Sequence, residues 1–333
     1  MVIAMSTLHA DQLPRFNLRL ARNDVADSRL FRNLFNSLYV RRVDEDYYRW
    51  QFFSTPFPSK LAFAIAEDGT LVGCYGFHVI PAAQQDARIA WALDIMVAPP
   101  YQGKGVFRPL AAFAAQQVIP YLPAALCVMA NQRADRAHAD GLGWSRVMTI
   151  SNFVCQTSCA LTPPQDFKFH LHRDFDAGAV ASIEALQASS RTSNLRSAKY
   201  LRWRFVKNPW YRYALFLVSV RGQPFGYLVL KTFRNPQTDA ASGDIVDVIW
   251  SQDHEQGLSA MLCFALGHFR DSGLSEASVW LQTNTMLDQV GKTLGFVESS
   301  QKRFFCAKIL DERCRYLEEP ARWFVTMSDA EIY

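Results

Sequence analysis

The segment YYRWQFFSTP, residues 47–56, occurs a second time as YLRWRFVKNP at residues 200–209. The register of 153 residues persists outside this segment: Gly73 corresponds to Gly226, Asp94 to Asp247 and Asn131 to Asn284. One register kept over so much sequence indicates an internal duplication. We therefore predict two copies of one domain, at residues 1–160 and 161–333, the second including a C-terminal tail. The seam QTSCALTPPQDF, residues 156–167, carries the paired prolines of a connection.

The two copies predict the same order of elements on either side of this seam. A strand and a helix are followed by a short aromatic helix, three strands, a helix, a buried strand, a helix and closing strands. This order indicates a mixed α/β fold in each copy. Strands are expected at residues 17–21, 61–67, 71–80, 88–97 and 125–129, and again at 168–172, 214–220, 225–233, 243–250 and 277–281. The first helix of each copy is expected at residues 24–39 and 174–187.

Composition excludes several classes of protein. Half of the 333 residues are hydrophobic, which suffices for large cores, and the net charge of +4 comes without a dense Lys/Arg run, so nucleic acid is not an expected partner. The seven cysteines form no CxxC pair, so neither a disulfide framework nor a zinc site is indicated. The sequence shows no signal peptide and no apolar run of membrane-spanning length. We expect a cytoplasmic protein that does not bind membranes.

A loop in the first copy, APPYQGKGVFRPL at residues 98–110, carries the clearest chemical signal. It follows a predicted strand and precedes a predicted helix, and it places Lys104 between Gly103 and Gly105. Glycines let backbone N–H groups converge on an anion, and a helix start adds unpaired donors and the positive end of its dipole. A turn loop without ligand is the alternative. We interpret the loop as a pyrophosphate site, although no P-loop G-K-[ST] and no GxGxxG is present.

Two motifs resemble the GNAT N-acyltransferases. Residues 102–107, QGKGVF, resemble the family's acyl-CoA pyrophosphate loop, Q/R-x-x-G-x-G/A, with Phe107 at the position that usually carries glycine or alanine. Residues 131–144, NQRADRAHADGLGW, resemble the pattern N-x-x-A-x-x-x-Y, with His138 at the position of the tyrosine. The resemblance covers most of residues 15–155 and, through the duplication, extends to about residue 310. The end of the chain, WFVTMSDAEI, is similar to the ends of tandem GNAT proteins associated with bacterial surface-sugar synthesis.

The resemblance implies two tandem GNAT-like domains that form an internal pseudo-dimer, with acyl-CoA as co-substrate and no metal. It places the thioester along the strand that ends at Val97, with the Ile95 amide as oxyanion donor. The residues it implies for acyl-CoA binding are Val97, Gln102, Gly103, Lys104, Gly105, Val106 and Asn131.

The candidates for proton transfer are less specific than the loop. His138 is the candidate acid for the departing thiolate, because imidazole titrates near neutrality. A helix-surface histidine without a role is the alternative. Asp94 and His78 are candidate bases, and water could also take the proton. Asp94 recurs as Asp247 in the second copy, which favours a structural role for it.

The second copy has lost the glycine loop. At the register of 153 residues, YQGKG becomes HEQGL at residues 254–258, and Glu255 brings negative charge to the position of the phosphates. We therefore expect the first copy to bind acyl-CoA and the second to serve as scaffold and as a wall of the acceptor site.

The predicted reaction is acyl transfer to the primary amine of a small acceptor. The favoured acceptor is a nucleotide-linked (dTDP or UDP) amino sugar for surface polysaccharide synthesis. The candidate acceptor-binding residues are Tyr48, Arg204, Lys207 and Trp210, of which the two cations would meet the diphosphate and a ring would stack on the base. A peptide, protein or polyamine acceptor is one alternative, and a non-catalytic CoA- or metabolite-binding protein is another. The protein is expected to be a monomer or a homodimer.

Overall fold

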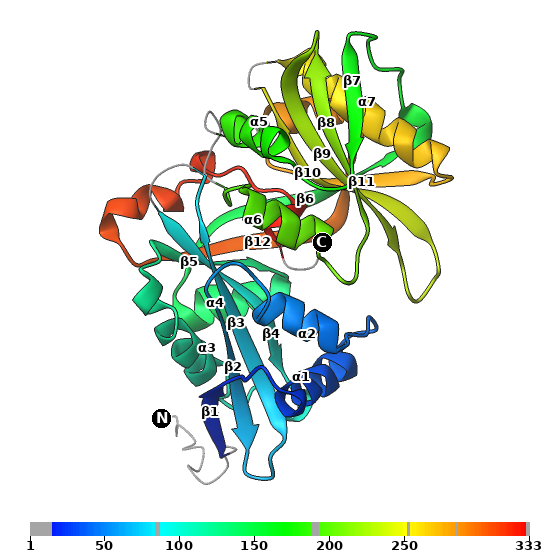
Figure 1. Ribbon diagram of the computed structural model, residues 1–333. Helices are drawn as coiled ribbons and strands as arrows, with labels where there is room; N and C mark the ends of the chain where they lie inside the picture. Colours follow the sequence, from blue (N-terminus) through cyan, green and yellow to red (C-terminus); the bar gives the residue numbers. More distant parts are fainter. Residues whose placement is uncertain (1–14, 84–86, 188–192, 252–253, 284, 331–333) are drawn as a thin grey trace, which may run out of the picture.

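A computed structural model describes residues 15–83, 87–187, 193–251, 254–283 and 285–330. Asn284, the predicted counterpart of Asn131, lies outside these ranges. Within them, twelve strands form one continuous mixed sheet that carries helices on both faces (Figure 1).

The elements of the first half follow the order predicted from the sequence. They are β1 (Phe16–Leu20), α1 (Val25–Leu38), α2 (Glu45–Phe52), β2 (Ser59–Ala66), β3 (Leu71–Pro81), β4 (Arg88–Val97), α3 (Phe107–Gln116), β5 (Ala125–Ala130), α4 (Gln132–Leu142) and β6 (Ser145–Gln156). Short 3₁₀ turns η2 (Pro99–Tyr101), η3 (Ile119–Tyr121) and η4 (Thr157–Cys159) connect some of them.

The second half repeats this order and adds a tail of short turns. Its elements are β7 (Phe167–His172), α5 (Ala177–Gln187), α6 (Ala198–Leu201), η5 (Arg202–Val206), β8 (Tyr213–Val220), β9 (Gln223–Arg234), β10 (Ala241–Trp250), α7 (Glu255–Asp271), β11 (Glu276–Leu281), α8 (Met286–Thr293) and β12 (Val297–Ile309). The tail contains η6 (Glu312–Glu318), η7 (Pro320–Arg322) and η8 (Met327–Asp329). The strands and helices predicted from the sequence are confirmed, apart from one or two residues at most ends and a later start of α5.

The order of strands in the sheet confirms the duplication. It runs β1-β2-β3-β4-β5-β12-β6-β11-β10-β9-β8-β7, so each half mirrors the other about the β6–β12 pair. In that antiparallel pair Ile150 lies opposite Arg303, and these two residues are related by the same register of 153. The two halves are therefore related by a pseudo-twofold axis through this pair.

The closing strands differ from the prediction. Each half has a single closing strand in the described ranges, and this strand pairs with strands of the other half. β12 lies between β5 and β6, and β6 lies between β12 and β11; the orange arrow of β12 lies among strands of the first half in Figure 1. The closing strand of each half thus pairs with the buried strand of the other half, β12 with β5 and β6 with β11. The division at residue 160 stays a prediction, because the sheet runs across it.

Side chains alternate between the two faces of the first half's strands, as β geometry requires. Ala62 and Ala64 of β2 face α3, which buries Leu110 and Ala114 against them. Leu61 and Phe63 face the other side, where they join a second cluster with α1 and α2. This second cluster continues into the other half without a break. The two halves therefore share one core.

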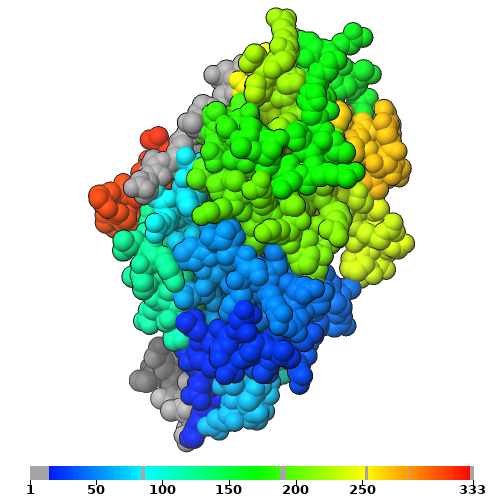
Figure 2. Space-filling view, viewed as in Figure 1, coloured from blue at the N-terminus to red at the C-terminus, as the bar shows by residue number. Residues whose placement is uncertain are grey.

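A reciprocal tryptophan pair joins the halves at the seam. The indoles of Trp50 and Trp203 stack with ring centroids 5.2 Å apart. Each indole N–H donates to the backbone oxygen of the other residue, at 2.9 and 3.2 Å. Symmetric exchange of this kind is what a twofold axis imposes on equivalent residues. Helices of the first half (blue) accordingly lie directly against the second half (green) in Figure 2.

We predict that Trp50→Ala destabilises the whole chain, because it removes a buried ring and the hydrogen bond from its indole N–H to the Trp203 oxygen. The expected loss is about 3–5 kcal/mol in the free energy of unfolding. Arg49→Ala, at an exposed neighbour in the same helix, should change it by less than about 0.5 kcal/mol. Urea unfolding followed by circular dichroism measures both. If the seam contributes little to stability, the two variants will have similar free energies of unfolding.

Candidate active site

The two central strands of the first half separate along their length. β4 and β5 pair in parallel only from Ile89 and Ala125 to Ala92 and Val128. Beyond these residues, β4 continues to Val97 without a partner on its β5 side. An unpaired strand edge presents backbone donors and acceptors to an extended ligand. Ile95 and Val97, predicted to hold the thioester and the adjoining arm, lie along this open edge.

The glycine loop lies just beyond the open edge. Gly103 and Gly105 have φ angles of +74° and +78°, a region that favours glycine, and both are exposed. The Lys104 amide donates within the loop to the Tyr101 oxygen at 3.3 Å. Among the described residues, the amides of Gly103, Gly105 and Val106 have no backbone acceptor. Three of the four predicted amides are therefore free to bind an anion.

The helix behind the loop begins without a side-chain cap. α3 starts at Phe107, and its N-cap residue Val106 offers no side-chain oxygen. An uncapped helix start leaves backbone donors and a positive dipole end available. The Gln102 amide group, by contrast, donates to the Val97 oxygen at 2.7 Å, and Arg133 donates to the oxygen of the same side chain. Gln102 thus ties the loop to β4.

His138 lies inside the domain, under the start of α3. Its side chain is fully buried, with Nε2 2.7 Å from the Tyr75 hydroxyl and Nδ1 2.7 Å from the Ala134 oxygen. Phe107 packs edge-on against it at 5.3 Å, which also directs that ring into the core beneath the loop. Burial lowers the pKa of His138. These contacts fit a packing role, and they leave both ring nitrogens occupied, so the geometry gives no support to His138 as an acid.

A cavity of about 330 Å³ lies at the seam, where the open edge of β4 meets the second half. Its walls come from α1, α2 and their connection, from the divergent ends of β4 and β5, and from η5 and the tail of the second half. The residues that line it include Arg41, Tyr47, Gln51, His78, Asp94, Ile95, Met129, Asn131, Asn194, Trp203, Arg204, Trp210, Arg303, Asp329 and Ala330. Asn131, predicted to bind the co-substrate, caps α4 by accepting from the Arg133 and Ala134 amides at 3.1 and 2.9 Å.

Asp94 lies in this cavity wall at an irregularity of β4. The register of β3 with β4 shifts there, and Asp94 has a φ angle of +45°, which is uncommon outside glycine. Its carboxylate accepts from the Tyr47 hydroxyl at 3.1 Å and from the Gln51 amide at 3.4 Å. Burial raises the pKa of Asp94 to about 6, although these bonds and the charge of Arg41 act in the opposite direction. A carboxylate of this pKa can exchange a proton near neutral pH.

His78, the other candidate base, is less well placed to accept a proton. Its Nε2 lies 2.7 Å from the Gln51 backbone oxygen, and its ring packs between Phe52 and Trp203. Burial lowers the pKa of His78 to about 4, and the charge of Arg204 acts in the same direction. The imidazole is therefore neutral near pH 7, with one nitrogen occupied by the backbone.

The predicted acceptor-binding residues are only partly brought together. Arg204 and Trp210 line the cavity, whereas Lys207 is exposed and is not among the lining residues. Trp210 already contacts two groups: the Tyr47 ring stacks on it at 3.9 Å, and the Arg41 guanidinium lies 3.5 Å from its ring centre. Little of the indole surface is left for a nucleobase.

Tyr48 is a core residue. Its side chain is fully buried among Phe31, Phe52 and Phe53, and its hydroxyl donates to the Arg22 oxygen at 2.7 Å. The neighbouring Tyr47 faces the cavity instead. Adjacent helical positions point in directions about 100° apart, and the sequence offers no signal for which of two tyrosines faces inward.

The cavity residues absent from the sequence predictions include Arg41, Gln51 and Arg303. Gln51 could have been found, because it is the residue at the register position of Arg204 and follows Trp50 at the seam. Arg41 lies in the connection between α1 and α2, and Arg303 lies in the exchanged strand β12. Neither residue forms part of a sequence motif.

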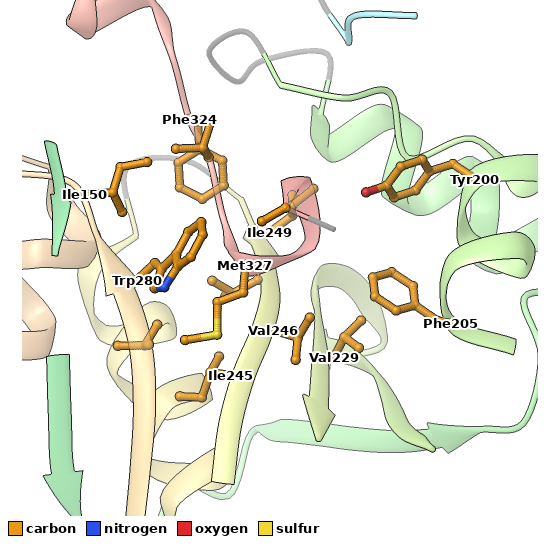
Figure 3. Close-up of a cluster of buried hydrophobic side chains, with 14 of the residues drawn as sticks. Ile150, Tyr200, Phe205, Val229, Ile245, Val246, Ile249, Trp280, Phe324 and Met327 are labelled. Carbon is orange, nitrogen blue, oxygen red and sulfur yellow. The ribbon is translucent and has the colours of Figure 1, made fainter. Parts of the chain in front are cut away.

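The equivalent region of the second half is closed by the tail. β10 and β11 pair only from Gly243 and Ala277 to Ile245 and Val279 before they separate. Phe324 and Met327 of the tail fill the space between them, packed among side chains of β10 and β11 (Figure 3). The side chain of Gln282 accepts from the Val325 amide at 3.1 Å and donates to the Trp323 oxygen at 3.1 Å. The tail thus takes the place of a ligand here.

The described residues at the corresponding helix start of the second half do not form an anion site. α7 begins at Glu255, and its N-cap His254 accepts the Gly257 amide through Nδ1 at 3.2 Å. Gly257 is packed so closely that a Cβ would lie 2.0 Å from the Phe225 ring. The remaining glycine of HEQGL therefore serves packing, and the acidic residue stands in the first turn, as expected from the sequence.

Asp247, the counterpart of Asp94, is bound in a buried ion-pair cluster. Arg196 donates to Asp247 at 2.9 Å and to Asp329 of the tail at 2.7 Å, and all three are buried. Thr326 of the tail also donates to Asp247 at 2.7 Å. The register position of Arg196 in the first half is Val43. The same aspartate is therefore structural in one half and faces a cavity in the other.

Comparison with known proteins finds a family match within the first half. Residues 28–144 match the family model of the acetyltransferase (GNAT) family. A search of curated protein sequences finds no match.

In the ranges described, the helices are too short or too polar to cross a membrane. The His, Cys, Asp and Glu side chains of these ranges do not form groups of three that could hold a metal ion.

Solved structures share the fold over most of the chain. A GCN5-related N-acetyltransferase from Anabaena variabilis matches with a TM-score of 0.66 and 13% identity, over 92% of this chain and 75% of its own. A tandem GNAT protein from the clavulanic acid biosynthesis pathway matches with a TM-score of 0.63 and 14% identity, over 89% and 98%. Saccharomyces cerevisiae N-myristoyltransferase, solved with bound myristoyl-CoA, gives 0.64 and 10%, over 88% and 78%.

The matched residues 28–144 contain α2, the open edge of β4, the glycine loop and α4, so the sequence match and the site coincide. The structural matches extend the same fold to the second half. Residues 28–144 thus carry a domain of the acetyltransferase (GNAT) family, and the fold of the chain as a whole is that of tandem GNAT proteins.

Proposed function

We propose that the protein transfers an acyl group from acyl-CoA to the primary amine of an acceptor bound in the seam cavity. The observation that carries this proposal is the position of Asp94, whose carboxylate lies where the open edge of β4 meets the cavity. An acyl donor along that edge and an amine in the cavity would meet beside a carboxylate able to accept a proton near neutral pH.

The first half offers contacts that suit the pyrophosphate, the pantetheine arm and the thioester of acyl-CoA. The free amides of Gly103, Gly105 and Val106, with the uncapped start of α3, suit the pyrophosphate. The open edge of β4 up to Val97 suits the amide-bearing pantetheine arm, which can add to it as a strand would. Acyl-CoA supplies the activated thioester carbonyl. The Ile95 amide would donate to its oxygen as negative charge develops there.

The amine acceptor must lose two protons, and the coenzyme A sulfur takes up one. Asp94 would accept a proton from the acceptor nitrogen as the C–N bond forms and the C–S bond breaks. Its hydrogen bonds from Tyr47 and Gln51 hold the carboxylate in the wall, next to the residues that would contact the amine. The remaining proton reaches solvent. A metal has no part in this scheme.

The acceptor predicted from the sequence is a nucleotide-linked amino sugar. Arg204 in the cavity wall supports it, because a guanidinium binds phosphate oxygens well. The exposed position of Lys207 and the covered ring of Trp210 do not add to that support. A peptide amine is the second candidate, and the N-myristoyltransferase fold match is the observation that favours it.

We predict that Gly105→Ala weakens coenzyme A binding about tenfold, because a Cβ at a φ of +78° strains the backbone that presents the loop amides. Gly222→Ala is the matched control: it has a φ of +80°, open space around it, and a place in the second half. Isothermal titration with coenzyme A measures both. If the loop does not hold coenzyme A, the two variants will bind it equally.

We predict that Asp94→Asn lowers kcat at least 100-fold and leaves coenzyme A affinity within about threefold, since it removes the proton acceptor and keeps the shape. In the wild type, kcat should rise with pH through about 6 as Asp94 ionises. Because burial raises the folded-state pKa of Asp94, the fold loses stability as pH rises from about 4, the unfolded value, to about 6. The variant should therefore be more stable than the wild type at pH 8.

Thiol release and thermal unfolding across pH 5–9 test both parts of the Asp94 prediction. Asp247→Asn is the control at the equivalent position, where Arg196 and the tail hold the carboxylate. That variant should lose stability without the pH-dependent change in kcat. Full turnover in Asp94→Asn would exclude Asp94 as the base.

A further inference from the structure

Arg204 is a buried cation whose bonding is incomplete. The side chain is 3% exposed, and its Nη2 donates to the Ala330 oxygen. Its Nε has no hydrogen-bond acceptor, and among the described residues no carboxylate forms a salt bridge with it. Burial of an unpaired guanidinium carries a large free-energy penalty. Such a group in a cavity wall indicates that a bound anion completes its bonding.

The cavity as a whole has an excess of positive charge. Arg41 and Arg303 line it together with Arg204. Among the residues that the structure describes, two carboxylates line it as well, but Asp329 is already paired with Arg196 at 2.7 Å. The remaining carboxylate, Asp94, has a raised pKa. The cavity therefore favours an anionic ligand by its net charge.

This charge is not inherited from the duplicated fold. The register positions of Arg41, Arg204 and Arg303 in the opposite half carry Asn194, Gln51 and Ile150, which are all uncharged. A structural requirement of the fold would act on both halves, because the halves share it. The three arginines instead distinguish this cavity from the region of the second half that the tail fills.

A second group with incomplete hydrogen bonding, Gln51, lines the same cavity. The Oε1 atom of Gln51 is buried and has no hydrogen-bond donor, while its Nε2 donates to Asp94 at 3.4 Å. An acceptor oxygen next to a carboxylate suits an amine. Gln51 and Arg204 occupy equivalent positions beside the stacked Trp50 and Trp203, so the two incomplete groups flank the seam from opposite halves.

We propose that the acceptor is an amine that itself carries an anionic group, a carboxylate or a phosphate, which binds the Arg204 guanidinium while the amine faces Gln51 and Asp94. This inference rests on the proposed function and narrows its acceptor to a charged class. Arg204 acts as a specificity residue and takes no part in proton transfer. Amines without an anionic group, polyamines included, are poor ligands of this cavity.

The test uses pairs of amines that differ only in the anion. Glucosamine 6-phosphate is compared with glucosamine for the phosphate, and serine with serinamide for the carboxylate; a UDP-linked amino sugar tests the diphosphate. Binding to the full chain saturated with coenzyme A is measured by calorimetry, and thiol release from acetyl-CoA is measured in parallel. The variants are Arg204→Gln, which installs the residue of the equivalent position, and Arg204→Lys. Arg212→Gln, at an exposed arginine of the same segment, is the control.

The wild type and Arg212→Gln should bind the anionic member of at least one pair tenfold or more tighter than its neutral partner. Arg204→Gln should reduce this preference to less than threefold, with KM raised and kcat little changed, and Arg204→Lys should keep part of it. The pair that shows the preference identifies the anion. Arg204→Gln should also be at least as stable as the wild type without ligand, because it removes an unpaired buried charge.

The outcomes separate this inference from the proposed function. Tight, Arg204-dependent binding of an anionic amine without thiol release would uphold the anion site and contradict acyl transfer to that class. Thiol release with neutral amines, equal in the wild type and Arg204→Gln, would uphold acyl transfer and overturn the inference. A wild type that binds none of the anionic probes better than their neutral partners would overturn it as well.

Discussion

The pairing of β6 with β12 is the constraint on which the rest of the structure depends. Each of these strands closes the sheet of the other half, so neither half has a complete sheet of its own. β5 illustrates the consequence: it pairs with β4 over four residues, Ala125 to Val128, and with β12 along its whole length. The divergence of β4 and β5 is therefore held open by a strand of the second half. The second half has lost the glycine loop, but its strand β12 still sets the geometry of the first half, which has that loop.

The duplication makes it possible to separate what the fold requires from what the site requires. Asp94 and Asp247 both stand at an irregularity of a central strand, which suggests that the fold tolerates a carboxylate there. Their surroundings have diverged, because Arg196 and the tail neutralise one of them and Val43 stands at the position of Arg196 in the other half. The glycine loop shows the same divergence, since His254 caps the helix that corresponds to α3. The first half thus keeps a cavity, and residues of the second half form part of its wall.

Two buried polar side chains at the seam, Gln51 and Arg204, have incomplete hydrogen bonding. The reciprocal Trp50–Trp203 pair brings the residues that follow them, Gln51 and Arg204, to one cavity from opposite halves. Most buried polar groups in folded proteins have hydrogen-bond partners. Two incomplete groups of complementary character in one cavity wall are therefore informative about a ligand, and the ligand they suit has both a donor and an anion.

The sequence by itself determined the duplication, the order of elements and the loop, because these depend on local periodicity and on residues close together in the chain. It could not determine the exchange of β6 and β12, since the same strands would satisfy their hydrogen bonds within each half or between halves. It also placed His138 and Tyr48 in a site from which burial removes them, and it missed Arg41, Gln51 and Arg303. Only the packing of the two halves about the pseudo-twofold axis decides which of two adjacent tyrosines faces the cavity. The same packing decides which distant arginines gather there.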